Sequence, residues 1–136
     1  MAEVDLSKLH ILVVEDEKYT REVMTKVLKG IGAGKISSAK DGYKALAILQ
    51  EAKWEVDVIL LDLQMPRVNG YEFLKKLHDE FLPPLSDTPV IVISGHSEKK
   101  SLDRARGLGV GLFLLKPITP DQVVTRINAA VRHKFE

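Results

Sequence analysis

Polar side chains of reactive types follow four short apolar runs of this sequence. Glu15 and Asp16 come directly after the first run, Asp62 after the second, Ser94 after the third and Lys116 after the fourth. The runs consist of Val, Ile, Leu and Phe without polar alternation, which is typical of strands covered on both faces. Because open α/β sheets bind ligands outside the carboxyl ends of their strands, we expect these side chains to gather at one edge of a sheet.

The types of these side chains suggest phosphoryl chemistry. Two carboxylates about 4 Å apart repel by roughly 4 kcal/mol at an effective dielectric constant near 20, so cations must offset them. Lys116 supplies one positive charge, and a hard divalent cation with oxygen ligands, Mg²⁺ above all, is the natural second. A carboxylate, a magnesium ion, a lysine and a hydroxyl group form a set that handles phosphoryl groups, in which Asp62 could be the nucleophile.

The elements that must position these residues can be read from the hydrophobic pattern. The apolar runs cover residues 11–14, 58–61, 90–93 and 112–115, and a more polar run covers 35–39. Between them, apolar residues recur at helical spacing in 23–31, 45–52, 73–77, 102–108 and 123–131. Alternating strands and helices predict a parallel sheet with helices on both faces. The polar run suits an edge strand, so we predict an α/β, doubly wound, flavodoxin-like (βα)5 fold with strand order 2-1-3-4-5.

Length and composition restrict the possible functions. The chain of 136 residues fits one domain, 1–136, with a core expected at about 10–133. The net charge of +1 argues against a partner held mainly by charge, such as DNA or an anionic membrane surface. The absence of cysteine excludes disulfides and thiolate catalysis. Because no run approaches a membrane span and the N-terminus lacks signal-peptide features, we expect a cytoplasmic protein.

Several other features are interpreted as structural. The glycine-rich segments 30–34 and 107–111 each end a helix and lead into a strand, so they are expected to cap helices rather than bind a dinucleotide. Thr119, Pro120 and Gln122 predict the start of the last helix. The histidines show no metal-ligand spacing, and His10 is expected at the surface.

With these residues in place, the chain resembles the receiver domains of response regulators, the phosphoacceptors of two-component signalling. The resemblance extends from about residue 10 to about residue 133. The matching segments, in order, are Val14-Glu15-Asp16, Leu61-Asp62-Leu63-Gln64-Met65-Pro66 with Gly70, then Ser94, then Lys116-Pro117.

The resemblance implies a role for each site residue. Asp62 would accept a phosphoryl group from the phosphohistidine of a sensor histidine kinase or of a histidine phosphotransfer protein. Mg²⁺ would be held by Asp16, Asp62 and the backbone carbonyl of Gln64, with Glu15 acting partly through water. Lys116 and, once the group is present, Ser94 would contact the phosphoryl oxygens.

The resemblance also implies a conformational relay. As Ser94 shifts, the ring of Phe113 would turn inward and change the face formed by the fourth helix, the fifth strand and the fifth helix. Gln64 and His96 would influence how fast the phosphoryl group is lost, and Pro117 would follow a cis peptide bond. Four positions depart from the common pattern: Glu15 replaces an aspartate, Ser94 replaces a threonine, Phe113 lacks a phenol, and Ile118 stands where an aromatic residue is frequent.

Alternative interpretations remain for some residues and for the whole chain. Phe113 could be ordinary core packing, Gln64 and His96 could be solvated loop residues, and the basic side of the fourth helix could be a solvated face or a docking surface. A stand-alone receiver domain, not an enzyme, would act through a downstream protein partner. A magnesium phosphatase of the haloacid-dehalogenase type would need an aspartate where Gln64 stands, and a degenerate docking module would have lost Asp62, Asp16 or Lys116.

Overall fold

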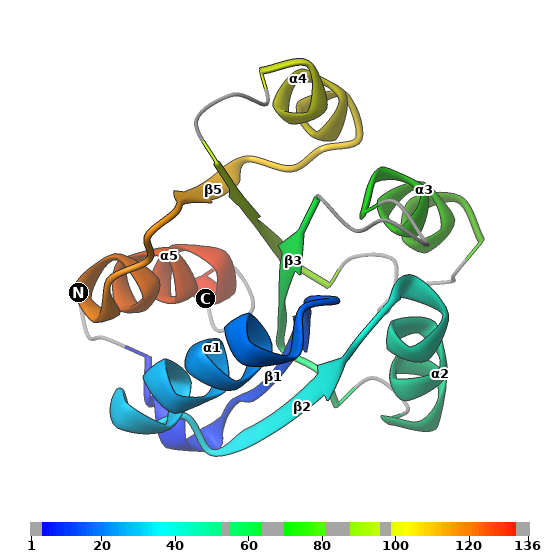
Figure 1. Ribbon diagram of the computed structural model, residues 1–136. Helices are drawn as coiled ribbons and strands as arrows, with labels where there is room; N and C mark the ends of the chain where they lie inside the picture. Colours follow the sequence, from blue (N-terminus) through cyan, green and yellow to red (C-terminus); the bar gives the residue numbers. More distant parts are fainter. Residues whose placement is uncertain (1–3, 53–54, 64–69, 81–87, 96–98, 133–136) are drawn as a thin grey trace.

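The protein is an α/β sandwich built on a parallel sheet (Figure 1). The computed structural model describes residues 4–52, 55–63, 70–80, 88–95 and 99–132. Within these residues the elements, in chain order, are η1 (Leu6–Lys8), β1 (His10–Val14), α1 (Lys18–Gly30), β2 (Lys35–Ala39), α2 (Gly42–Ala52), β3 (Val58–Asp62), α3 (Gly70–Glu80), β4 (Val90–Ser94), α4 (Lys99–Gly107), β5 (Leu112–Leu115) and α5 (Pro120–Val131). None of the helices in these ranges has the length and apolar character of a membrane span.

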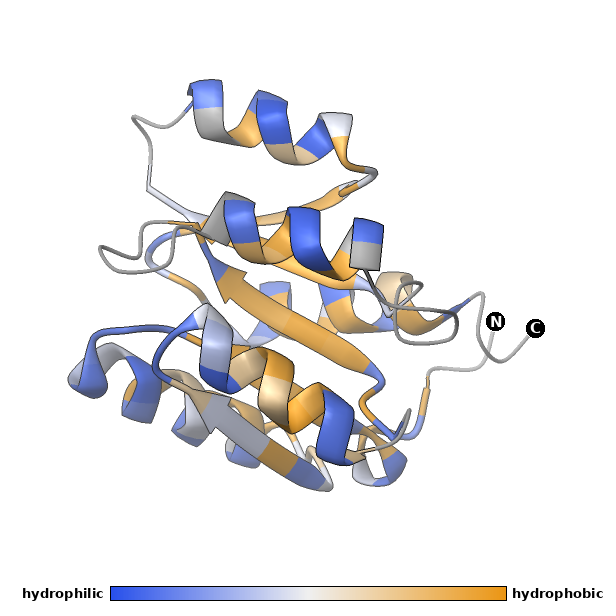
Figure 2. Cartoon of the chain, turned by 90° about the vertical axis from the view of Figure 1, so that its right-hand side faces the viewer, coloured by the Kyte–Doolittle hydropathy of each residue, from blue (hydrophilic) through white to orange (hydrophobic). Residues whose placement is uncertain are grey.

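The sheet has the predicted topology. Its strands are parallel and run in the order β2-β1-β3-β4-β5, so the predicted doubly wound, flavodoxin-like (βα)5 fold is confirmed. Helices α1 and α5 cover one face, and α2, α3 and α4 cover the other. In Figure 2 the central strands are apolar along almost their whole length, as expected of strands covered on both faces, whereas the helices carry both hydrophilic and apolar residues.

Alternate residues of each central strand supply the two halves of the core. Leu12 of β1 and Ile59 of β3 are fully buried under α2 and α3, whereas Ile11 and Leu60 are fully buried under α1 and α5. This two-sided burial explains the absence of polar alternation in these strands. It also holds the strands in one register, which decides where their last residues lie.

The predicted helix ends are confirmed. Gly32 and Gly109 each have φ of +94°, a left-handed conformation that glycine adopts without steric cost, directly after α1 and α4. At the start of α5, the Thr119 hydroxyl accepts a hydrogen bond from the backbone N–H of Gln122, with Pro120 in the first turn. Both glycine-rich segments are therefore helix-to-strand connections.

Two expectations about burial are wrong. The run at β5 is not covered on both faces, because β5 is the second edge strand of the sheet and Leu115 is 47% exposed. His10 is not a surface residue, since it is 6% exposed at the start of β1 and its Nε2 lies 2.7 Å from the Ser37 hydroxyl. Its position between two neighbouring strands, rather than its residue type, determines its burial.

Residues that precede β1 already pack against the core. Val4 and Leu6 pack against the α1–α5 side of the core, and the Val4 N–H donates a 2.8 Å hydrogen bond to Asn128 Oδ1 of α5. The 3-10 turn passes close to the loop between α1 and β2, where the Gly34 N–H donates to the Leu6 carbonyl at 3.0 Å. This loop therefore fixes the entry of the chain into β1.

A methyl group at Gly34 should disrupt that passage. Its Cβ would collide with the backbone carbonyl of Ser7 and lie 3.3 Å from the Leu9 carbonyl oxygen. We expect Gly34→Ala to lower the free energy of unfolding by about 1–3 kcal/mol. Gly30→Ala is the matched control, because nothing lies within 4 Å of a Cβ there and alanine is the better helix former. Urea titrations of both variants check this, and equal midpoints would contradict it.

Candidate functional site

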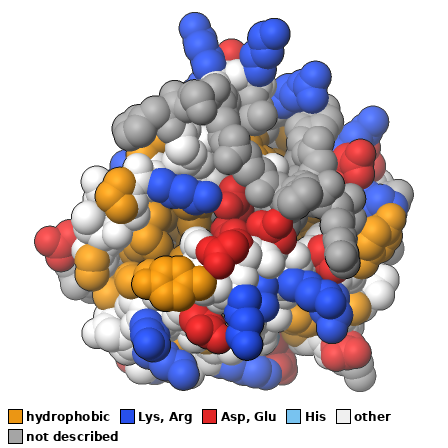
Figure 3. All heavy atoms as spheres, in the orientation of Figure 1, with side chains coloured by type: hydrophobic (Ala, Val, Ile, Leu, Met, Phe, Trp, Pro, Cys, Tyr) orange, Lys and Arg blue, Asp and Glu red, His pale blue; other side chains and the backbone are white. Residues whose placement is uncertain are grey.

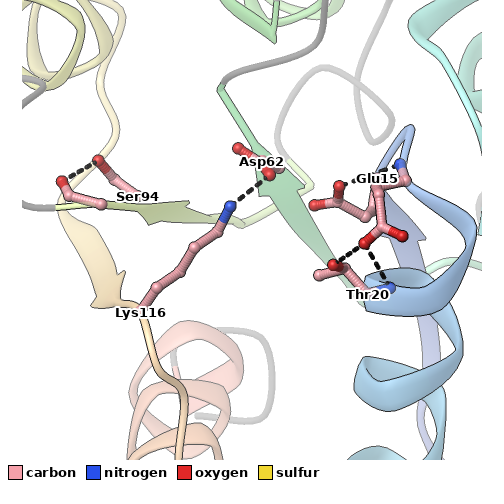
Figure 4. A network of polar contacts seen from close by, with 7 residues as sticks. Glu15, Thr20, Asp62, Ser94 and Lys116 are labelled. Carbon is pink, nitrogen blue, oxygen red and sulfur yellow. Dashed lines mark hydrogen bonds and ion pairs between the residues drawn. The ribbon is translucent and has the colours of Figure 1, made fainter.

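The strand register brings the predicted site residues to one edge of the sheet. Asp62 and Ser94 are the last residues of β3 and β4, while Glu15 and Lys116 directly follow β1 and β5. Asp62 pairs in register with Ile93, the residue before Ser94, and Ser94 pairs with Leu115, the residue before Lys116. In Figure 4, Asp62 lies between Lys116 on one side and Glu15 on the other.

Asp62 is a buried carboxylate with a charged partner. The residue is 1% exposed, and its Oδ2 accepts a 2.8 Å hydrogen bond from Lys116 Nζ. The side chain of Lys116 is 38% exposed, so the ammonium group reaches the carboxylate from the solvent side. A charge-assisted hydrogen bond of this kind stabilises the ionised form of a carboxylate that burial alone would disfavour.

Glu15 is a second buried carboxyl group beside Asp62. It is 2% exposed, and its Oε1 accepts a 3.2 Å hydrogen bond from the Glu17 N–H. Among the described residues, Oε2 is buried with no hydrogen-bond partner. Burial first, and then the neighbouring Asp62 carboxyl group, raise the pKa of Glu15 to about 8. Within the described residues, Glu15 therefore places a buried carboxyl oxygen without a hydrogen-bond partner next to Asp62.

Two further residues shape this loop, and the sequence analysis missed the contribution of Arg21. Arg21 of α1 donates from Nη1 to the Glu15 carbonyl at 2.8 Å and lies 3.4 Å from the Asp16 carbonyl. Glu17 caps α1, because its carboxylate accepts from the N–H groups of Tyr19 and Thr20 and from the Thr20 hydroxyl. A cation one turn into a helix that follows an acidic loop is the signal that could have identified Arg21.

Ser94 and the start of the last loop are joined through the backbone. The Ser94 hydroxyl is buried and donates a 2.9 Å hydrogen bond to the Gly95 carbonyl. The Lys116 N–H donates to the Ser94 carbonyl at 2.9 Å, so β4 and β5 stay paired up to the site. The Lys116–Pro117 peptide bond is cis, as predicted.

On the surface, acidic side chains lie together near the centre of the face shown in Figure 3. Asp16 is half-buried beside Glu15, and its backbone carbonyl faces Arg21. Gln64 and His96, which were predicted to influence the loss of the phosphoryl group, lie outside the described residues. The same edge of the sheet carries Glu15, Asp62, Ser94 and Lys116, as the sequence predicted.

The sequence model of the response regulator receiver domain matches residues 11–128. The chain belongs to this family. Receiver domains are signalling modules of two-component systems, so the family assignment and the geometry of the strand ends agree.

Relatives of this receiver domain differ in length. It is 38% identical over 124 residues to the phosphate regulon transcriptional regulatory protein PhoB of Escherichia coli (strain K12), covering 90% of this chain and 51% of PhoB. It is 30% identical over 141 residues to probable histidine kinase 2 of Oryza sativa subsp. indica, covering 95% of this chain and 13% of the kinase. This chain thus spans about half of one relative and a small part of the other.

Solved receiver structures have the same fold. The chemotaxis protein CheY4 of Vibrio cholerae superposes with a TM-score of 0.79 at 25% identity, over 90% of this chain and 98% of CheY4. A receiver domain protein from Clostridium thermocellum gives a TM-score of 0.83 at 25% identity, over 93% and 96% of the two chains.

The carboxyl oxygens at this edge of the sheet supply some, but not all, of the ligands that a hard cation needs. Glu15 Oε2 is a buried carboxyl oxygen without a hydrogen-bond partner in the described structure, and carboxylate oxygen is the ligand that Mg²⁺ prefers. Among the described residues no three acidic or histidine side chains form a ready cluster. A cation here would therefore depend on water and backbone oxygens as well as on Asp16 and Asp62, which is usual for Mg²⁺.

Removing the lysine should destabilise the site through Asp62. Lys116→Gln leaves the Asp62 carboxylate buried without its 2.8 Å charged partner, so we expect the free energy of unfolding to fall by about 1–3 kcal/mol. Adding Asp62→Asn should restore much of that loss, because no buried charge then remains. Chemical denaturation of the two single variants and the double variant measures the coupling, and additive effects would contradict the interpretation.

Proposed function

We propose that this receiver domain is a phosphorylation-dependent switch whose acceptor is Asp62. The observation that carries the proposal is the buried Asp62 carboxylate at the carboxyl edge of β3, 2.8 Å from Lys116 Nζ. A carboxylate oxygen attacks the phosphorus of a donor phosphohistidine, and an O–P bond forms as the N–P bond breaks. The electron pair of the broken bond stays on the imidazole nitrogen, which takes up one proton from solvent.

The neighbouring side chains of this chain hold the charge of the phosphoryl group. Lys116 already contacts the acceptor carboxylate from the solvent side, so its ammonium group can follow a negative charge that grows there. The Ser94 hydroxyl now donates to the Gly95 carbonyl and can rotate to donate to a phosphoryl oxygen instead. This exchange is the proposed first step of the relay.

Mg²⁺ is the proposed cofactor. Asp16, Asp62 and the Gln64 backbone carbonyl would hold it, with Glu15 acting through water. When bound, the ion would neutralise the carboxylates and the incoming phosphoryl oxygens. The part of this site that lies in the described residues contributes a buried, unsatisfied carboxyl oxygen, which supports the proposal.

The proposed partners are a sensor histidine kinase or histidine phosphotransfer protein as donor, and a downstream protein that reads the face formed by α4, β5 and α5. Because β5 is an edge strand with Leu115 at the surface, this face can present apolar area to a partner. We do not propose a phosphatase acting on other substrates, since Gln64 stands where such an enzyme needs its second aspartate. Direct nucleic-acid binding is not part of the proposal.

Phosphoryl transfer can be tested without knowing the kinase. Incubation with Mg²⁺ and acetyl phosphate should add the mass of one phosphoryl group, seen by intact-mass spectrometry. Asp62→Asn should remain folded by circular dichroism and gain no mass. Ser94→Ala should still be labelled, because its hydroxyl assists but does not form the bond. Labelling of Asp62→Asn would disprove this assignment of the acceptor.

Magnesium should also stabilise the folded chain. Binding to the folded state alone, at tenfold above its Kd, contributes about 1.4 kcal/mol, which is roughly 3–6 °C in melting temperature for a chain of this length. Asp16→Ala should abolish most of this shift, whereas Glu51→Ala, exposed on α2, should keep it. Thermal unfolding with MgCl₂, compared with NaCl at equal ionic strength, measures the effect, and an unchanged shift in Asp16→Ala would exclude Asp16 as a ligand.

A further inference from the structure

Phe113 of β5 is held at two points by arginines from the helices on either side. The Arg106 guanidinium carbon of α4 lies 4.9 Å from the centroid of the Phe113 ring, which is cation–π distance. Arg126 Nε of α5 donates a 3.0 Å hydrogen bond to the Phe113 backbone carbonyl. One contact therefore depends on where the ring points, and the other does not.

The ring contact joins β5 to α4, a short helix of largely polar sequence. Helix α4 has the sequence KKSLDRARG, so its apolar side consists of little more than Leu102 and Ala105. Figures 1 and 2 both show it as the uppermost helix, at the β5 end of the sheet. Arg106 also forms an exposed ion pair on α4, since its Nη1 lies 3.0 Å from Asp103 Oδ1 one turn earlier.

We propose that Arg106 is a positioning residue that holds the Phe113 ring, and with it α4, in the resting arrangement. The inference rests on the proposed function and on the relay that the family resemblance implies, in which phosphorylation of Asp62 turns the ring inward. That turn breaks the Arg106–ring contact and leaves the Arg126 hydrogen bond intact, so β5 stays docked on α5 while α4 is released. A tyrosine at position 113 could have been held by a hydrogen bond from its hydroxyl group. In this chain the contact between Arg106 and the Phe113 ring has that role.

Linkage gives the direction of the effect. An interaction that exists only in the resting state opposes phosphorylation by the amount that it stabilises that state. The inference takes the arrangement with the ring inward as the one that reacts with the phosphodonor, so removing the contact should raise the rate of phosphorylation, whereas loss of a merely structural contact would leave the rate unchanged or lower it. For a partly exposed cation–π pair we expect a change of about two- to fivefold.

The test measures the initial rate of phosphoryl uptake from acetyl phosphate, with the acetate group leaving as Asp62 forms its O–P bond. Arg106→Gln should raise the rate by about two- to fivefold. Arg106→Lys should stay near the wild-type rate because it keeps a cation over the ring. Lys100→Gln, which removes a charge from an exposed position of the same helix, is the matched control and should not change the rate.

Two further measurements make the outcome decisive. In a Phe113→Leu background, Arg106→Gln should have no additional effect, because the aromatic face is gone. Without any phosphodonor, the ring resonances of Phe113 should shift in Arg106→Gln and stay in place in Lys100→Gln. The inference is overturned if Arg106→Gln behaves like Lys100→Gln, or if its effect is the same with Leu at position 113.

Failure of the proposed function would look different. If wild-type chain gains no phosphoryl group at Asp62, the switch itself is disproved, and the release of α4 by phosphorylation falls with it. The resting contact is then judged separately, by the double-mutant cycle of Arg106→Gln and Phe113→Leu in thermal unfolding. A coupling of zero in that cycle overturns the positioning role whether or not Asp62 is phosphorylated.

Discussion

A buried carboxylate at the end of a central strand imposes the main constraint on this structure. Removing an ionised group from water costs several kcal/mol unless a partner compensates, and Asp62 is 1% exposed beside the equally buried Glu15. Within the described part of the chain, Lys116 provides that compensation at 2.8 Å. Three features bring the Lys116 ammonium group to the Asp62 carboxylate. They are the strand order, the register of β3 with β4 and of β4 with β5, and the backbone hydrogen bond from the Lys116 N–H to the Ser94 carbonyl.

The same arrangement links the site to a distant surface. Lys116 continues β5, and Phe113 lies three residues earlier on that strand, between Arg106 of α4 and Arg126 of α5. In the proposed relay, a change in charge at Asp62 would act first on Lys116 and on Ser94, which pairs with Leu115 at the end of β4 and β5. Because β5 is an edge strand with one side open, it can adjust its side chains without disturbing the buried strands in the centre of the sheet.

Much of the fold follows from patterns that act over a few residues. The unbroken apolar runs predicted the strands, the apolar spacing predicted the helices, and Gly32, Gly109 and Thr119 marked helix ends where φ and capping bonds were later found. The positions of Asp62, Ser94 and Lys116 at strand ends followed from the same reading, since parallel strands present their carboxyl ends at one edge. Their roles in phosphoryl transfer and in magnesium binding stay predictions, as does the relay through Phe113.

The amino-acid sequence by itself determined the order of elements, the helix ends and the edge at which the acids, the hydroxyl group and the lysine meet, because these depend on local periodicity and on residue type. Only the tertiary structure decided the burial of His10, the exposure of Leu115 and the stacking of Arg106 on Phe113. Each of these is a relation between residues on different elements or at the rim of the sheet. Such relations depend on which surfaces face one another once the helices are packed. The residue pattern of one segment does not specify which other segment will pack against it.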